Sequence, residues 1–166
     1  GKTVYSGGGD SVLCAWDVAT GKERHAVTFS RIEKKEDATA SVYALAVSPD
    51  GKEVLSGAGN GWLRVHDARD LKTLRELWPK SGTPGLASAV GFGANGEIVT
   101  NDTNEAVRVW TAKGESRMFS ANSTKARTPV RVPLAVSSDG SLVIRPLLND
   151  KPNLWYRDAT DVGVWE

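Results

Sequence analysis

The feature that most constrains the fold of this chain is a repeat with a period of about 44 residues. Turn glycines recur at spacings of 50, 45 and 44 residues, at Gly1, Gly51, Gly96 and Gly140. An aromatic residue or a histidine near the end of each unit keeps the same period, at Trp16, His66, Trp110 and Trp155 or Tyr156. Two independent landmarks therefore agree on repeating units, and extra residues around 30–38 lengthen the first spacing.

Within a unit the residue pattern is that of β-strands. Residues 42–48 read Val-Tyr-Ala-Leu-Ala-Val-Ser, and apolar side chains on both alternating sets predict a strand covered on both faces. Asp50-Gly51 and Asn60-Gly61 are strong hairpin signals, with further strands expected at 53–56, 62–66 and 73–77. Residues 71–78 also fit a short helix, but their place in the repeat favours a strand. Each unit is therefore predicted to be a four-stranded antiparallel meander.

These units resemble the WD-repeat β-propeller family. Trp16-Asp17 is the dipeptide that gives the family its name, and His66-Asp67 and Trp110-Thr111 stand at the same place in the next two units. The resemblance covers the whole chain and implies an all-β propeller of four-stranded antiparallel blades, with 15 strands in about four blades. The blades are expected at residues 1–30 (from its second strand), 39–79, 84–121 and 129–166.

The resemblance also implies a hydrogen-bonded structural tetrad in each blade. Its members here are Ser6, Asp10 and Trp16; Ser56, Asn60 and His66; Thr100, Asn104 and Trp110; and Asp150 with Tyr156, for which Trp155 is a rival register. The chain departs from the family pattern because the Gly-His pair before the first strand is absent and Asn replaces Asp twice. We therefore expect these blades to depend more on packing between sheets.

The predicted ring is incomplete. Propellers usually close with about four to eight blades, and closure protects strand edges and blade faces. The first unit lacks its first strand, so we expect the chain to be part of a larger ring. The remaining blades would come from the same longer chain or from another chain.

Composition and charge narrow the possible partners. A net charge of +1 argues against a uniformly basic nucleic-acid binder, and no apolar run is long enough to span a membrane. The single cysteine, Cys14, rules out an internal disulfide framework. With one cysteine and no secretory signal, we expect a cytoplasmic location.

No catalytic, cofactor or metal site is predicted. The two histidines, His25 and His66, have no further His, Cys or carboxylate at metal-ligand spacing. Residues 91–96 match a dinucleotide-binding fingerprint, but that loop must open a helix and residues 97–100 instead favour a strand.

Candidate binding residues lie where loops meet on the propeller rim. The charged loop 30–38 contains Lys34 and Lys35, and its net charge is zero. Other rim positions are chosen by their place in the repeat or by an unusual residue type. With those two lysines, the candidates are Tyr43, Trp62, Ser88, Glu105 and Arg131. Trp62, expected to be exposed, is the strongest of them as a hot spot.

The predicted function is a non-catalytic platform, or scaffold, that binds a protein partner on the rim. Two alternatives stay open. One is a hydrolase or oxidoreductase acting on a small molecule, with a channel site completed by blades outside this chain. The other is a sensor domain that regulates an attached effector.

Overall fold

The computed structural model describes residues 1–29, 41–59, 61–78, 86–93, 96–102, 106–120, 135–137, 142–146, 152–157 and 162–165. Fifteen strands are found in these described residues, and no α-helix. The all-β prediction is therefore confirmed. The described part of the chain has no helix long and apolar enough to cross a membrane.

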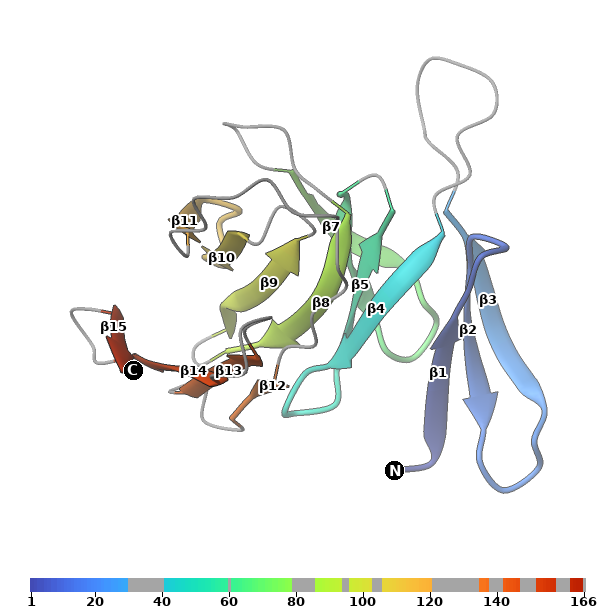
Figure 1. The fold of residues 1–166 in the computed structure, drawn as a ribbon. Coiled ribbons are helices and arrows are strands. Elements are labelled where there is room, and N and C mark those ends of the chain that lie inside the picture. The colour runs from blue at the N-terminus through green and yellow to red at the C-terminus, as the bar shows by residue number, and fades with distance from the viewer. Residues whose placement is uncertain are drawn as a thin grey trace, which may run out of the picture.

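The strands form four antiparallel sheets, each joining strands in sequence order (Figure 1). The first sheet holds β1 (Thr3–Gly7), β2 (Val12–Asp17) and β3 (Glu23–Thr28). The second holds β4 (Val42–Val47), β5 (Glu53–Ala58), β6 (Leu63–Asp67) and β7 (Thr73–Leu77). The third holds β8 (Ala87–Phe92), β9 (Ile98–Asp102), β10 (Ala106–Trp110) and β11 (Ser116–Ser120). The fourth holds β12 (Ala135–Val136), β13 (Leu142–Pro146), β14 (Pro152–Arg157) and β15 (Val162–Trp165).

Turn residues account for the strand order. Gly51 has φ +71°, a backbone conformation that glycine adopts without steric cost, and it closes the turn from β4 to β5. The turn from β6 to β7 places Leu71 at φ +60°, whereas the same turn in the first sheet has Gly21 at φ +66°. Residues 73–77 form β7, so the helical alternative for this segment is wrong.

Two apolar cores lie between neighbouring sheets. The first joins the first and second sheets through buried Leu13, Ala15, Phe29, Val42, Ala58 and Leu71. The second joins the second and third sheets through buried Leu55, Leu63, Val65, Leu77, Ala87, Val90, Phe92, Ile98 and Trp110. The second sheet is thus buried on both faces, which explains why its strands are rich in apolar residues.

Glycines let neighbouring sheets approach closely. A Cβ atom at Gly7 of β1 would collide with Val42, the first residue of β4. A Cβ atom at Gly57 of β5 would lie 2.9 Å from that of Ala87, the first residue of β8. A close approach at a glycine therefore recurs between the first and second sheets and between the second and third sheets.

The expectation that residues 42–48 form a strand covered on both faces is wrong at two positions, Tyr43 and Val47. Ala44 and Leu45 pack against the two cores on opposite faces of β4. Tyr43 and Val47 are 36% and 48% exposed. Val42 at the start of the strand is buried and the middle residues are half-buried, so the apolar pattern overestimates burial at Tyr43 and Val47.

Candidate functional site

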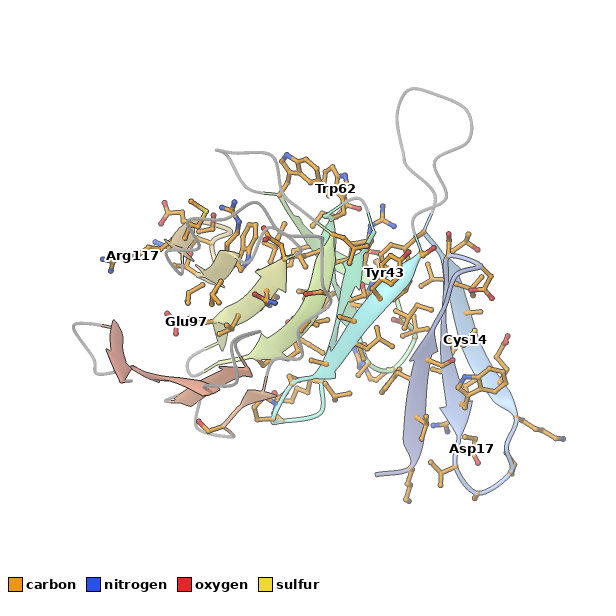
Figure 2. All side chains as sticks on the ribbon, in the orientation of Figure 1. Cys14, Asp17, Tyr43, Trp62, Glu97 and Arg117 are labelled. Atoms are coloured by element: carbon orange, nitrogen blue, oxygen red, sulfur yellow. The ribbon has the colours of Figure 1, made fainter. Side chains whose placement is uncertain are left out.

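The end of the second sheet that carries the start of β4 and the turn from β5 to β6 presents exposed aromatic side chains. Tyr43 and Trp62 lie at this end, and Asp17 lies at the opposite end of the first sheet (Figure 2). The rings of Trp62 and Trp78 pack with centroids 4.8 Å apart and planes tilted by 37°. Trp78 is 40% exposed. We call Tyr43, Trp62 and Trp78 the aromatic end.

Trp62 is only half-buried, because one side of it packs against the core between the first and second sheets. The sequence predicted an exposed tryptophan, and the structure leaves Trp62 only partly exposed. Trp78, which sequence reasoning did not select, is the more exposed of the two rings. The sequence feature that could have identified Trp78 is its position just after the fourth strand of its unit, across the β6–β7 hairpin from Trp62.

Tyr43 and Ser88 sit at equivalent β-bulges. The register of β4 on β5 shifts between Val42 and Ala44, and that of β8 on β9 shifts between Ala87 and Ala89. The extra residue is Tyr43 in one sheet and Ser88 in the other. Bulges change the direction of a side chain and are common beside functional sites.

The two bulged residues have different surroundings. The Tyr43 ring lies over Gly59, where an added Cβ atom would be 2.7 Å from its Cε2. The Ser88 hydroxyl donates to the Asn101 carbonyl oxygen at 3.1 Å and accepts from the Asn101 side-chain amide at 3.3 Å. Tyr43 therefore offers an exposed ring, whereas Ser88 is held inside its own sheet.

Several predicted residues lie outside the described part of the chain. These are the rim candidates Lys34, Lys35, Glu105 and Arg131 and the tetrad candidates Asn60, Asn104 and Asp150. Tyr156 lies in β14, opposite Leu142 and Gly163. For these positions the sequence assignments stay predictions.

A side-chain hydrogen bond with a spacing of ten residues recurs in the first three sheets. The Trp16 indole N–H donates to the Ser6 hydroxyl at 2.8 Å, and the Trp110 indole N–H donates to the Thr100 hydroxyl at 3.0 Å. In the second sheet, Ser56 Oγ lies 3.0 Å from His66 Nε2. Asp10, the other tetrad candidate described, accepts the backbone N–H of Val12 at 3.1 Å and so acts as a turn residue.

His66 reverses the direction of this hydrogen bond. Its Nδ1 lies 3.2 Å from the Leu71 carbonyl oxygen, which can only accept, so Nδ1 carries the proton. Nε2 of the neutral ring then accepts from the Ser56 hydroxyl, which also lies 3.2 Å from the Arg64 carbonyl oxygen and shares its one proton between these two acceptors. Burial lowers the pKa of His66 to about 4, which keeps the ring neutral.

Phe29 packs against the His66 ring from the first sheet, and Arg64 packs on Phe29. The Phe29 ring meets that of His66 edge-on, with centroids 5.7 Å apart. The Arg64 guanidinium carbon lies 4.6 Å from the Phe29 centroid, and its Nε donates to Glu76 at 2.7 Å. Such a cation–π contact adds attraction to the apolar packing between the sheets.

The third sheet has an arginine at the position equivalent to Arg64. Arg108 is 6% exposed, and its Nε lies 4.0 Å from an oxygen of Asp102, which is also 6% exposed. The sequence did not single out this pair, because charged residues in an alternating strand are ordinarily placed on the solvent face.

The described residues offer little for covalent or metal chemistry. Burial raises the pKa of the half-buried Cys14 thiol, which disfavours the reactive thiolate. Within the described residues, no three His, Cys, Asp or Glu side chains form a group that could hold a metal ion.

The neutral His66 ring predicts that stability falls in mild acid. Its ordinary pKa of 6.5 applies in the unfolded chain, whereas the folded value is about 4, so the unfolded state binds the proton first as pH falls. Between pH 7 and pH 5 the free energy of unfolding should drop by about 2 kcal/mol through this residue. Urea unfolding at both pH values measures the drop, and His66→Gln should remove that share of the slope. An unchanged slope in this variant would contradict the assignment.

Comparison with known proteins gives a distant relative. No family model matches the chain. The chain is similar to the ribosome biogenesis protein YTM1 of Laccaria bicolor, with 31% identity over 115 residues. The matched stretch is 66% of this chain and 23% of the relative, so the chain spans less than a quarter of that protein's length.

Proposed function

We propose that this chain is part of a WD-repeat β-propeller that binds a protein partner at its aromatic end. The observation that carries the binding function is the packed Trp62–Trp78 pair, with 40% of Trp78 exposed, at the same end as the exposed Tyr43. Tryptophan and tyrosine are the residue types most often found at the energetic centre of protein interfaces.

The packing of the sheets supports a propeller. The second sheet packs its Ser56 and His66 face toward Phe29 of the first sheet, and Trp110 of the third sheet packs into the core shared with the second. The corresponding face of the first sheet carries Ser6 and Trp16, which are hydrogen-bonded in the same way but partly exposed. A further blade against that face would give it the environment of the other two.

The edge of the first sheet supports the same proposal. β1 corresponds to β5 and β9, each of which pairs on one side with β4 or β8. Within the described residues, β1 pairs only with β2. A strand from the rest of a longer chain, or from another chain, would complete this sheet, and such a strand pairs through backbone hydrogen bonds.

The similarity to YTM1 suggests where to look for the partner. That relative is named for ribosome biogenesis, and we extend the setting to this chain as part of the proposal. A non-catalytic role and a cytoplasmic location stay predictions from the sequence.

The binding test compares two exposed apolar side chains. Trp78→Ala should weaken partner binding at least tenfold, because exposed tryptophan anchors contribute about 2 kcal/mol or more. Met118→Ala, on β11 and 54% exposed, is the matched control and should leave the affinity unchanged. Proteins captured by the wild-type protein are identified by mass spectrometry, and the affinity of each for the variants is then measured. Equal affinity of all partners for Trp78→Ala and the wild-type protein would refute the proposed surface.

A further inference from the structure

A second candidate binding site lies at the opposite end of the second sheet from the aromatic end. A groove with a volume of about 410 Å³ opens between the first sheet and two turns of the second. Its walls include Tyr5, Arg24 and His25 on one side and Gly51, Ala68 and Arg69 on the other. Gly51 belongs to the β4–β5 turn and Arg69 to the β6–β7 turn, which lies beside β1 in Figure 1. The two turns are joined by the Ala68 backbone N–H, which donates to the Lys52 carbonyl oxygen at 2.9 Å.

The groove is lined by basic side chains. Arg24, His25 and Arg69 line it, and none of its described lining residues is an aspartate or glutamate. The carboxylates that contact the two arginines are not among the lining residues. Asp67 accepts from Arg69 Nε at 3.0 Å and Nη2 at 2.7 Å, and Asp17 lies 3.7 Å from Arg24 Nε.

These carboxylates hold the guanidinium groups in place. The hydrogen bonds from Arg69 lower the pKa of Asp67 to about 2, so this partner stays ionised. Arg24 Nη1 also donates to the Thr3 hydroxyl at 3.2 Å. A guanidinium has five N–H donors, so both arginines keep donors for a further anion.

Strand geometry places Arg24 in the groove. The register of β2 on β3 shifts between Ala15 and Trp16, because Ala15 pairs with His25 and Trp16 pairs with Glu23. Arg24 is the extra residue of this bulge. The equivalent bulge in the second sheet carries Leu74, so the charge at this position is particular to the first sheet.

We infer that this groove binds an acidic, extended segment of a protein partner. Two anchored guanidinium groups and an imidazole complement carboxylates, and a half-open polar groove suits a peptide better than a compact apolar ligand. RNA fits less well, because Tyr5 is partly buried in the groove wall and its hydroxyl donates to the Ala68 carbonyl oxygen at 2.7 Å. Sequence-specific RNA sites commonly use exposed aromatic faces for base stacking. The site is independent of the aromatic end.

Fluorescence anisotropy of the intact protein with a labelled peptide of alternating glutamate and alanine tests the inference. We expect a dissociation constant on the order of 100 μM at low salt, and weaker binding as salt screens the charges. Arg24→Gln and Arg69→Gln should each weaken binding roughly fivefold. In Arg69→Gln, Asp67 can still accept the backbone N–H of residue 69, at 2.8 Å in the present structure, so the turn is expected to persist.

A matched control and a charge reversal complete the test. Arg117→Gln removes an arginine from β11, far from the first sheet in Figure 2, and should leave peptide binding unchanged. The double variant Arg24→Glu, Arg69→Glu should lose the glutamate peptide and gain a lysine–alanine peptide. Equal loss in Arg117→Gln, no loss in the groove variants, or tighter binding of a single-stranded RNA than of the peptide would overturn the inference. Because none of these variants touches Trp78, failure here leaves the proposed partner surface intact.

Discussion

Replacing Trp110 by alanine should lower the free energy of unfolding by about 4 kcal/mol. Trp110 is 2% exposed and packs with Leu55 and Ile98 in the core between the second and third sheets. Its indole N–H also donates to the Thr100 hydroxyl. The substitution removes these contacts and leaves a cavity that a packed core refills only in part. Urea unfolding followed by circular dichroism measures the change.

Two further variants separate packing from the hydrogen bond. Trp110→Phe keeps most of the apolar contact and loses the indole N–H, so it should cost about 1.5 kcal/mol. Met118→Ala on the exposed side of β11 should stay within about 0.5 kcal/mol of the wild-type protein. A cost below about 1 kcal/mol for Trp110→Ala would contradict the packing described for the third sheet.

Replacing Phe29 by alanine should cost about 3 kcal/mol. Phe29 is 2% exposed and follows β3, where it contacts the His66 ring and lies under the Arg64 guanidinium. Its loss would open a cavity between the first and second sheets and remove the cation–π contact. The same urea experiment gives the cost.

Two further variants separate the loss of packing at position 29 from the loss of the cation–π contact. Phe29→Leu fills most of the cavity without an aromatic face and should cost about 1 kcal/mol. Leu74→Ala, at a side chain that is 49% exposed, should change stability by less than about 0.5 kcal/mol. Similar costs for Phe29→Ala and Leu74→Ala would mean that the first two sheets do not share a core.

Local turn chemistry made much of the strand order predictable. Asp50-Gly51 requires a reversal, and the apolar residues on either side fix where β4 ends and β5 begins. The repeat placed β7 at residues 73–77, although the same residues also fit a helix. A period shared by several units carries more information than one short pattern, which explains why the strand assignment succeeded.

The side-chain environments were less predictable, because they depend on contacts between sheets. Trp62 follows a turn, so sequence reasoning left it exposed, but the core of the neighbouring sheet covers one side of it. The bulges at Tyr43 and Ser88 depend on pairing with the next strand and leave no clear mark in the residue order. Trp78 was not selected from the sequence, because its contact with Trp62 depends on the pairing of β6 with β7.

At His66 the family resemblance predicts the position of the side chain but not the direction of its hydrogen bond. Resemblance aligned His66 with Trp16 and Trp110, and the side chain indeed lies within hydrogen-bond distance of the serine ten residues earlier. The direction of the proton depends on the Leu71 carbonyl oxygen, which lies 3.2 Å from Nδ1; Leu71 has a positive φ in the β6–β7 turn that follows His66. That backbone conformation could not be inferred from a leucine.

Site-specific photo-crosslinking tests the central claim, that the aromatic end binds a protein partner, most directly. A benzophenone amino acid is placed at position 78 or, as the control, at position 118, and each protein is irradiated in a cell extract. The account predicts a discrete protein adduct from position 78 and none from position 118. Adducts from position 118 alone, or the same adducts from both positions, would contradict it.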